Sequence, residues 1–226
     1  MSAAASPAPI ARRIRFYDAS IGKKAVMAIT GVILFGYVIG HLAGNLQVYA
    51  GPEKINSYAK FLHANTGLLW GVRLLLLVSV VLHITASVQL TMLKRAARPV
   101  GYVKKNDVPS AYAARTMMWS GPIIAAFVVF HILHLTTGSL LPLEETDVYR
   151  NLVSGFQIPV VSIAYIVAVS LLGMHLYHGI WSMFQSVGWN HPRYTPGLKR
   201  FAAWCSVLIT LGYISIPVSV LAGVVR

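Results

Sequence analysis

Residues 25–48 read AVMAITGVILFGYVIGHLAGNLQV, a run of 24 residues that contains no Asp, Glu, Lys or Arg. An α-helix rises about 1.5 Å per residue, so a run of this length crosses the roughly 30 Å hydrocarbon core of a bilayer. One ionisable side chain, His41, interrupts the apolar pattern. The run therefore predicts a membrane-spanning helix in which His41 needs a functional explanation.

Four further apolar runs follow, at residues 67–92, 117–141, 158–187 and 201–225. Each is long enough to span a bilayer. A membrane β-barrel would instead show ten-residue segments of alternating polarity. The sequence thus predicts an all-α integral membrane bundle of five transmembrane helices, with residues 1–24 as a cytoplasmic N-terminal segment and residues 25–226 as the transmembrane domain.

The composition excludes several classes of protein. Of the 226 residues, 56% are hydrophobic and 11% are charged, and the mean hydropathy is +0.64. Soluble domains carry about 25% charged residues, so a soluble enzyme is excluded. The chain has a single cysteine, Cys205, which excludes a disulfide scaffold, a protein-held iron–sulfur cluster and a covalently attached haem.

The net charge of +13 does not indicate a nucleic-acid partner, because the basic residues form no stripe with interleaved aromatic residues. Instead, 14 of the 19 basic residues lie before the first apolar run or after the second and fourth. The positive-inside rule then predicts a multi-pass protein of the cytoplasmic (inner) membrane, with its N-terminus in the cytoplasm and its C-terminus outside. The basic segment 95–116 is expected to fix this topology and to offer a docking surface for a cytoplasmic partner.

Six of the eight histidines lie inside the predicted spans, where ionisable side chains are costly and usually functional. They are His41, His83, His131, His134, His175 and His178.

Each of the six lies in the second half of its helix, and consecutive helices run antiparallel. The outer level of the membrane therefore holds His41 and the H-x-x-H pair of the third span. The inner level holds His83 and the H-x-x-H pair of the fourth. Two imidazoles from facing helices are what a low-spin haem b requires on the two faces of its iron.

Spacing alone does not choose the ligand within each H-x-x-H pair, because three residues are about one helical turn. Zinc suits these pairs poorly, since no thiolate or carboxylate lies near them in the spans. Beside His41, the glycines at 36, 40 and 44 recur every four residues. They either leave room for a flat ring or allow close packing of helices.

Three stretches together resemble one known family. They are SIGKKAVMAITGVILFGYVIGHLAGNLQ at 20–47, SGPIIAAFVVFHILHLTTG at 120–138 and GMHLYHGIWSMFQSVGWN at 173–190. They resemble the cytochrome b subunit of succinate dehydrogenase and fumarate reductase, and specifically the single-chain, five-helix, two-haem type often called cytochrome b558. The resemblance runs from about residue 15 to the end of the fifth span.

The resemblance implies a ligand set for two haem b groups. It implies that His41 and His131 hold the outer haem, and that His83 and His175 hold the inner one. His178 then stands at a non-ligand position, and His134 is expected to pack.

The resemblance also implies a function. A flavoprotein subunit oxidises succinate, an iron–sulfur subunit carries the electrons to the membrane, and this chain anchors both and passes the electrons to a quinone, usually menaquinone. No catalytic residue and no dicarboxylate chemistry are expected in this chain. The alternatives are a di-haem cytochrome b of a hydrogenase or formate dehydrogenase, and a non-redox membrane anchor or transporter.

Three further features bear on charge balance, proton movement and the quinone site. Arg73 is expected roughly 9 Å inside the outer end of the second helix, where it either neutralises a haem propionate or extends to the interface. Gly173 stands where some relatives carry an acidic residue for proton movement, so a carboxylate relay is not expected. No motif fixes the quinone site, for which the polar candidates near the outer end are Asn45, Gln47, Tyr58 and His63.

Overall fold

The computed structural model describes residues 16–97 and 110–226. In these residues the chain forms seven α-helices and two short 3₁₀ helices, with no strand. The elements are η1 (Phe16–Asp18), α1 (Ser20–Asn45), η2 (Leu46–Ala50), α2 (Pro52–Ala64), α3 (Thr66–Ala96), α4 (Ser110–Leu135), α5 (Val148–Phe156), α6 (Pro159–Ser186) and α7 (Thr195–Leu221). The predicted all-α class is confirmed.

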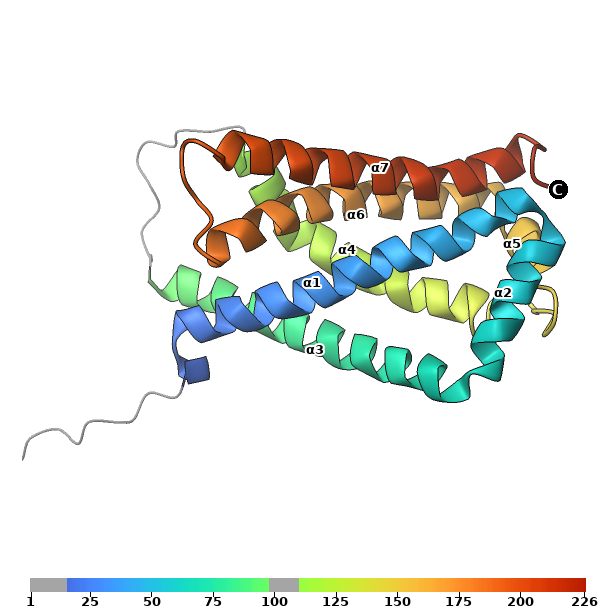
Figure 1. Cartoon of the computed structure of the whole chain (residues 1–226), viewed down its shortest axis with the longest axis horizontal. Helices are drawn as coiled ribbons and strands as arrows, with labels where there is room; N and C mark the ends of the chain where they lie inside the picture. The colour runs from blue at the N-terminus through green and yellow to red at the C-terminus, as the bar shows by residue number, and fades with distance from the viewer. Residues whose placement is uncertain (1–15, 98–109) are drawn as a thin grey trace, which may run out of the picture.

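Five of the helices are long and apolar enough to cross a membrane: α1, α3, α4, α6 and α7. They run alternately in opposite directions, so α1 begins at one end of the bundle and the C-terminus lies at the other (Figure 1). Large apolar side chains such as Leu74, Leu77 and Val81 of α3 are exposed on the outside. Such a surface suits contact with lipid rather than water. The predicted five-helix membrane bundle is confirmed.

The observed spans differ from the predicted ones mainly at their ends. The helix α1 begins at Ser20 rather than at residue 25. The third span ends at Leu135 rather than at residue 141, because Gly138 takes a φ of +67° and breaks the helical path. The Thr137 hydroxyl lies 2.7 Å from that of Ser139 and stabilises this turn.

Two short helices that the sequence analysis did not predict, α2 and α5, close one end of the bundle. Gly51, with a φ of +94°, turns the chain, and Pro52 then begins α2 at a position where its missing N–H costs nothing. Asp147 caps α5 by accepting a hydrogen bond of 3.0 Å from the Arg150 N–H. We call this end of the bundle the cap end, and the end where α1 begins the N-terminal end.

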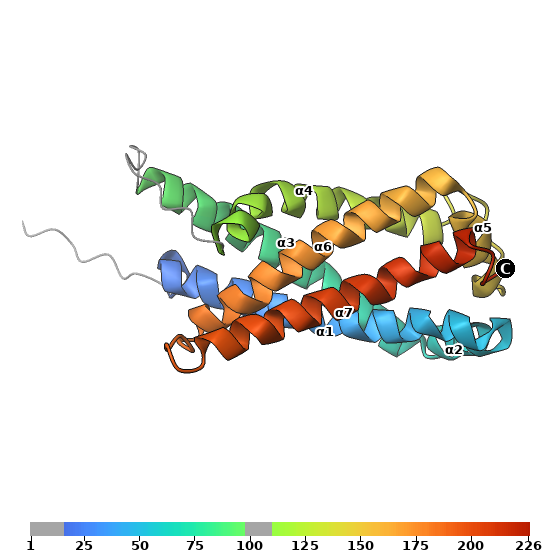
Figure 2. The same ribbon diagram turned by 90° about the horizontal axis from the view of Figure 1, so that it is seen from above.

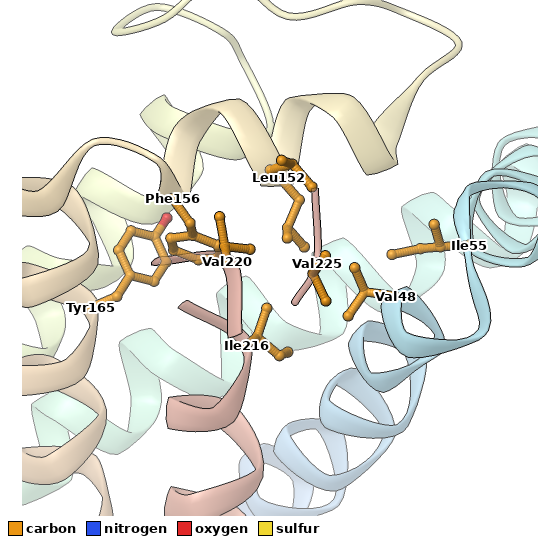
Figure 3. Close-up of a cluster of buried hydrophobic side chains, with 9 residues drawn as sticks. Val48, Ile55, Leu152, Phe156, Tyr165, Ile216, Val220 and Val225 are labelled. Carbon is orange, nitrogen blue, oxygen red and sulfur yellow. The ribbon is translucent and has the colours of Figure 1, made fainter. Parts of the chain in front are cut away.

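The cap end contains a compact hydrophobic cluster (Figure 3). Its buried residues come from η2, α2, α5, α6, α7 and the C-terminal segment: Val48, Ile55, Leu152, Val153, Phe156, Tyr165, Ile216, Val220 and Val225. Asn56 of α2 ties the two short helices together. Its amide donates to Asp147 (3.0 Å) and its carbonyl accepts from the Tyr149 N–H (3.0 Å).

Helix packing within the bundle is uneven. The helix α1 packs on α3, and α6 packs on both α4 and α7. In the two views α7 follows α6 along its length (Figures 1 and 2). Within the described part of the chain, neither α1 with α4 nor α3 with α6 forms an extensive backbone contact. These two helix pairs are the ones that carry the functional candidates.

Candidate functional site

The structure brings histidines together in two pairs at two depths of the bundle. Near the cap end, the rings of His41 (α1) and His131 (α4) have centres 5.8 Å apart and planes at 80°. Nearer the N-terminal end, the rings of His83 (α3) and His175 (α6) have centres 6.4 Å apart and planes at 55°. In each case the imidazoles bridge two helices whose backbones do not otherwise pack together. These are the partners that the resemblance implies.

The second histidine of the third span has a different environment. His134 is 1% exposed, and its ring lies against Gly155 of α5, where an added Cβ would come within 2.8 Å of the imidazole. His134 therefore packs between α4 and α5, as the sequence analysis expected. In the fourth span, the ring that meets His83 belongs to His175, while His178 is half-buried one turn further along α6.

Thr30 of α1 contacts the ring of His83. The Thr30 hydroxyl lies 2.8 Å from the Val26 carbonyl, within its own helix, and 3.0 Å from His83 Nδ1. When the hydroxyl donates to Val26, its oxygen is left to accept a hydrogen bond from Nδ1. In that arrangement His83 carries its proton on Nδ1, and the lone pair of Nε2 is free to bind a metal.

His41 is flanked by residues one turn away on its own helix. The Tyr37 ring stacks on it, with ring centres 5.3 Å apart and planes at 13°. The Asn45 amide donates to the His41 carbonyl (2.7 Å) and lies 3.4 Å from the imidazole nitrogens. Across the gap, the Phe127 ring stacks on His131, with centres 6.0 Å apart.

The glycines beside His41 divide into two kinds. A Cβ at Gly36 or Gly40 would meet nothing within 4 Å, whereas at Gly44 it would come within 2.8 Å of the Tyr58 ring. Gly44 therefore serves close packing, one of the two alternatives left open by the sequence. Among the described residues Gly36 and Gly40 have no such neighbour, which leaves room for a flat ring.

Arg73 lies on the cap-end half of α3. Its guanidinium stands over the Trp70 ring, 5.1 Å from the centroid, and the Trp70 side chain is itself exposed. The charge is also close enough to the Tyr37 hydroxyl to interact with it electrostatically. Arg73 thus places a positive charge near Tyr37, whose ring stacks on His41 of the cap-end pair.

Two of the four polar candidates for a quinone site lie near the cap-end pair, and a third, His63, is exposed on α2. Asn45 and Tyr58 lie close to His41 and Gly44 respectively. His63 is exposed on α2 and is hydrogen-bonded through Nδ1 to the Ala59 carbonyl (2.8 Å). The quinone site remains a prediction without a defined residue set.

The N-terminal end of the bundle is strongly basic, whereas the cap end carries acidic and basic residues in similar numbers. The cap end has Glu53, Glu144, Glu145 and Asp147 beside Lys54, Lys60, Arg150 and Arg226, and Arg150 pairs with Glu144 at 2.7 Å. The described basic residues of the N-terminal end are Lys23, Lys24, Lys94, Arg95, Arg115, Arg193, Lys199 and Arg200, with Asp18 as the described acidic residue there. Most of the segment expected as a docking surface, 95–116, lies outside the described residues, as do residues 1–15.

The donor set of the two pairs fits haem better than a bare metal ion. Across residues 16–97 and 110–226, no group of three or more His, Cys, Asp or Glu side chains could hold a metal ion. Haem iron needs only two protein ligands, one on each face. Since a metal–imidazole nitrogen bond is about 2 Å long, two imidazoles on opposite sides of one metal ion have ring centres about 6 Å apart. Both observed separations, 5.8 and 6.4 Å, match this spacing.

No family model, curated protein or solved structure matches the chain. The function has to be argued from the motifs in the sequence and from the geometry of the histidine pairs.

Proposed function

We propose that this chain is the haem b-containing membrane anchor of a succinate:quinone oxidoreductase (respiratory complex II), of the two-haem cytochrome b type. It would transfer electrons between an iron–sulfur subunit and a quinone, with menaquinone as the expected quinone. The observation that carries the proposal is the pairing of four intramembrane histidines, two by two, between helices that otherwise do not pack together. The stretches at 20–47 and 173–190, which resemble the cytochrome b family, direct the proposal to this family rather than to other di-haem proteins.

In this proposal His41 and His131 hold one haem b, and His83 and His175 hold the other. A bound haem b supplies reversible one-electron chemistry at its iron. Thr30 keeps the proton of His83 on Nδ1 and thereby presents Nε2 for binding. Arg73 provides a positive charge near the cap-end site, where it would offset the carboxylates of a haem.

The remaining residues of the spans exclude water and set the two sites at different depths. Because α1 and α4 carry their histidines near the cap end, and α3 and α6 carry theirs nearer the N-terminal end, the sites are staggered across the bundle. The basic residues of the N-terminal end favour a cytoplasmic location for that end. The iron–sulfur and flavoprotein subunits would dock there, and the cap end would face outside.

The test is purification of the tagged chain from membranes in a mild detergent. We expect a flavoprotein and an iron–sulfur subunit to co-purify, with haem b absorbance and succinate-dependent quinone reduction. Co-purification with hydrogenase or formate dehydrogenase subunits would replace the proposed enzyme by another di-haem respiratory complex. A chain without haem absorbance would overturn the proposal altogether.

A further inference from the structure

Tyr165 of α6 lies between the two histidines of α4. Its hydroxyl is 3.1 Å from His131 Nδ1 and 2.9 Å from His134 Nδ1. Tyr165 is 6% exposed and belongs to the hydrophobic cluster of the cap end, where it lies beside Phe156 (Figure 3). A buried hydroxyl therefore joins the candidate haem ligand His131 to the buried histidine one turn further along the helix.

Aromatic packing fixes the direction of this hydroxyl. The Tyr165 ring meets Phe127 and Phe156 edge to face, with centres 4.9 and 4.8 Å apart and planes at 86° and 87°. The Phe130 ring packs on it as well, at 5.8 Å. With rings from α4 and α5 on its sides, Tyr165 has little freedom to turn away from the two histidines.

The number of hydrogens available determines which atom donates in each of the two hydrogen bonds of the Tyr165 hydroxyl. A tyrosine hydroxyl has one hydrogen to donate and can also accept. It can donate to only one of the two Nδ1 atoms, so it must accept from the other. If His131 binds iron through Nε2, its proton is on Nδ1 and is donated to the Tyr165 oxygen. The Tyr165 hydrogen then goes to Nδ1 of His134.

The opposite arrangement does not allow ligation. If Tyr165 donated to His131, the proton of His131 would be on Nε2, and no lone pair would remain there for a metal. In the first arrangement His134 carries its proton on Nε2, the atom that is buried against Gly155 without a hydrogen-bond partner in the structure. Nε2 of His134 has no partner among the described residues in either arrangement, so the choice between the two rests on the need of His131 for a free Nε2 lone pair.

We propose that Tyr165 is a positioning residue that holds His131 in the Nδ1–H tautomer, with His134 accepting the Tyr165 hydrogen. This inference rests on the proposed haem-binding function and extends it to two residues that do not themselves touch iron. A hydrogen-bond acceptor on the far nitrogen makes an imidazole a stronger electron donor to its metal. The His131–Tyr165–His134 chain therefore lowers the reduction potential of the cap-end haem relative to the same site without it.

The test uses Tyr165→Phe in the purified complex, with the midpoint potentials of the two haems measured by spectroelectrochemical titration. We expect both haems to remain, the potential of the cap-end haem to rise and that of the other haem to stay unchanged. The matched control is Tyr213→Phe. This substitution also removes a hydroxyl near His41 (ring centres 6.2 Å apart), but one that donates to a backbone carbonyl, of Val38, and it should shift neither potential.

A second variant covers the case in which Tyr165→Phe loses the cap-end haem. His134→Leu leaves Tyr165 in place to accept from His131 but removes the acceptor of its hydrogen. The cap-end potential should then rise above that of the wild type, and by less than in Tyr165→Phe where that variant keeps its haem. Unchanged potentials in Tyr165→Phe, or in His134→Leu where the first variant has lost that haem, overturn the inference and leave the proposed function intact. A wild-type complex without haem overturns the proposed function itself.

Discussion

The two histidine pairs share a spacing but are held in place by different means. At the cap end, His131 is hydrogen-bonded to Tyr165, which is itself fixed by rings from two other helices and by His134. Nearer the N-terminal end, His83 is held by Thr30, whose hydroxyl is anchored to its own helix. The Nδ1 atom of His175 is buried and has no hydrogen-bond partner in the structure.

This difference shows that one geometry can depend on distant packing or on local contacts. The cap-end pair depends on the cluster that α2, α5 and the C-terminal segment form around Tyr165. The other pair depends on single side chains of the spanning helices. Substitutions behind the cap-end pair should therefore affect both stability and haem, whereas substitutions behind the other pair should affect haem alone.

Removal of a ligand should have the largest effect. We expect His131→Ala and His175→Ala each to lower the haem content from about two to about one per chain, with loss of a different haem in each variant. Pyridine haemochrome assays and reduced-minus-oxidised spectra measure this. The matched control is His178→Ala, on the same helix as His175 and one turn away, which should keep both haems. Retention of both haems in either ligand variant would remove that residue from the proposed set.

Gly155→Ala should have the next largest effect, because it disturbs the packing of α5 against His134, next to the cap-end pair. Its Cβ would come within 2.8 Å of the His134 ring, which has no room to move away. Overpacking of this kind costs about 1–3 kcal/mol, so the thermal midpoint of the detergent-solubilised protein should fall.

Gly197→Ala, in the exposed first turn of α7, is the control for that substitution. A Cβ there meets nothing within 4 Å among the described residues, so this substitution causes no overpacking. Its thermal midpoint should stay the same or rise. An equal loss of stability in the two variants would contradict the contrast between the packed cap end and the rest of the bundle.

Thr30→Val should have a smaller and purely local effect. Valine keeps the shape of threonine but removes the Thr30 oxygen that lies 3.0 Å from His83 Nδ1, so the haem held by His83 should rise in potential while the other stays unchanged. Thr85→Val removes an exposed hydroxyl that donates only to the Val81 carbonyl, and it should leave both potentials as they are. A shift of the cap-end haem in Thr30→Val would show that the two sites are not independent.

The smallest expected effect is a pH dependence of the stability of the cap end. The N–H of Arg150 and the amide of Asn56 donate to Asp147 and hold the pKa of its carboxyl below the ordinary value of 3.8. Folding therefore favours the carboxylate form. The carboxylate stabilises the folded state at neutral pH, and this stabilisation is lost as the pH falls below that value.

Hydrogen exchange of the α5 amides reports this loss. Protection should fall as the pH drops below 3.8 in the wild type, after correction for the intrinsic exchange rate, and Asp147→Asn should show less of this fall. An identical fall in both proteins would show that another group controls the stability of the cap end.

The sequence predicted the membrane architecture because long apolar runs are a strong local signal. It also predicted the depths of the histidines. Because consecutive spans run in opposite directions, His41 lies at the same depth as the histidines of the third span, and His83 at the same depth as those of the fourth. It did not predict α2 and α5, which are too short and too polar to stand out from connecting loops. These two helices nevertheless supply much of the cluster at the cap end.

The residues that contact the proposed haem ligands were also not predicted. Thr30 is 53 residues away from His83 in sequence, and Tyr165 is 34 away from His131, so each contact forms only once the helices are packed. Neither Thr30 nor Tyr165 departs from the composition of an ordinary spanning helix. The glycines show the same limit, since their repeat is identical at 36, 40 and 44 but only Gly44 has a packing partner.

The most direct measurement is the haem content of the purified wild-type chain, combined with a redox titration that resolves its components. The account predicts about two non-covalently bound haems b per chain, both low-spin with two histidine ligands, and each abolished by substitution in one histidine pair only. A colourless protein, or one in which substitution in either pair leaves both haems in place, would contradict it.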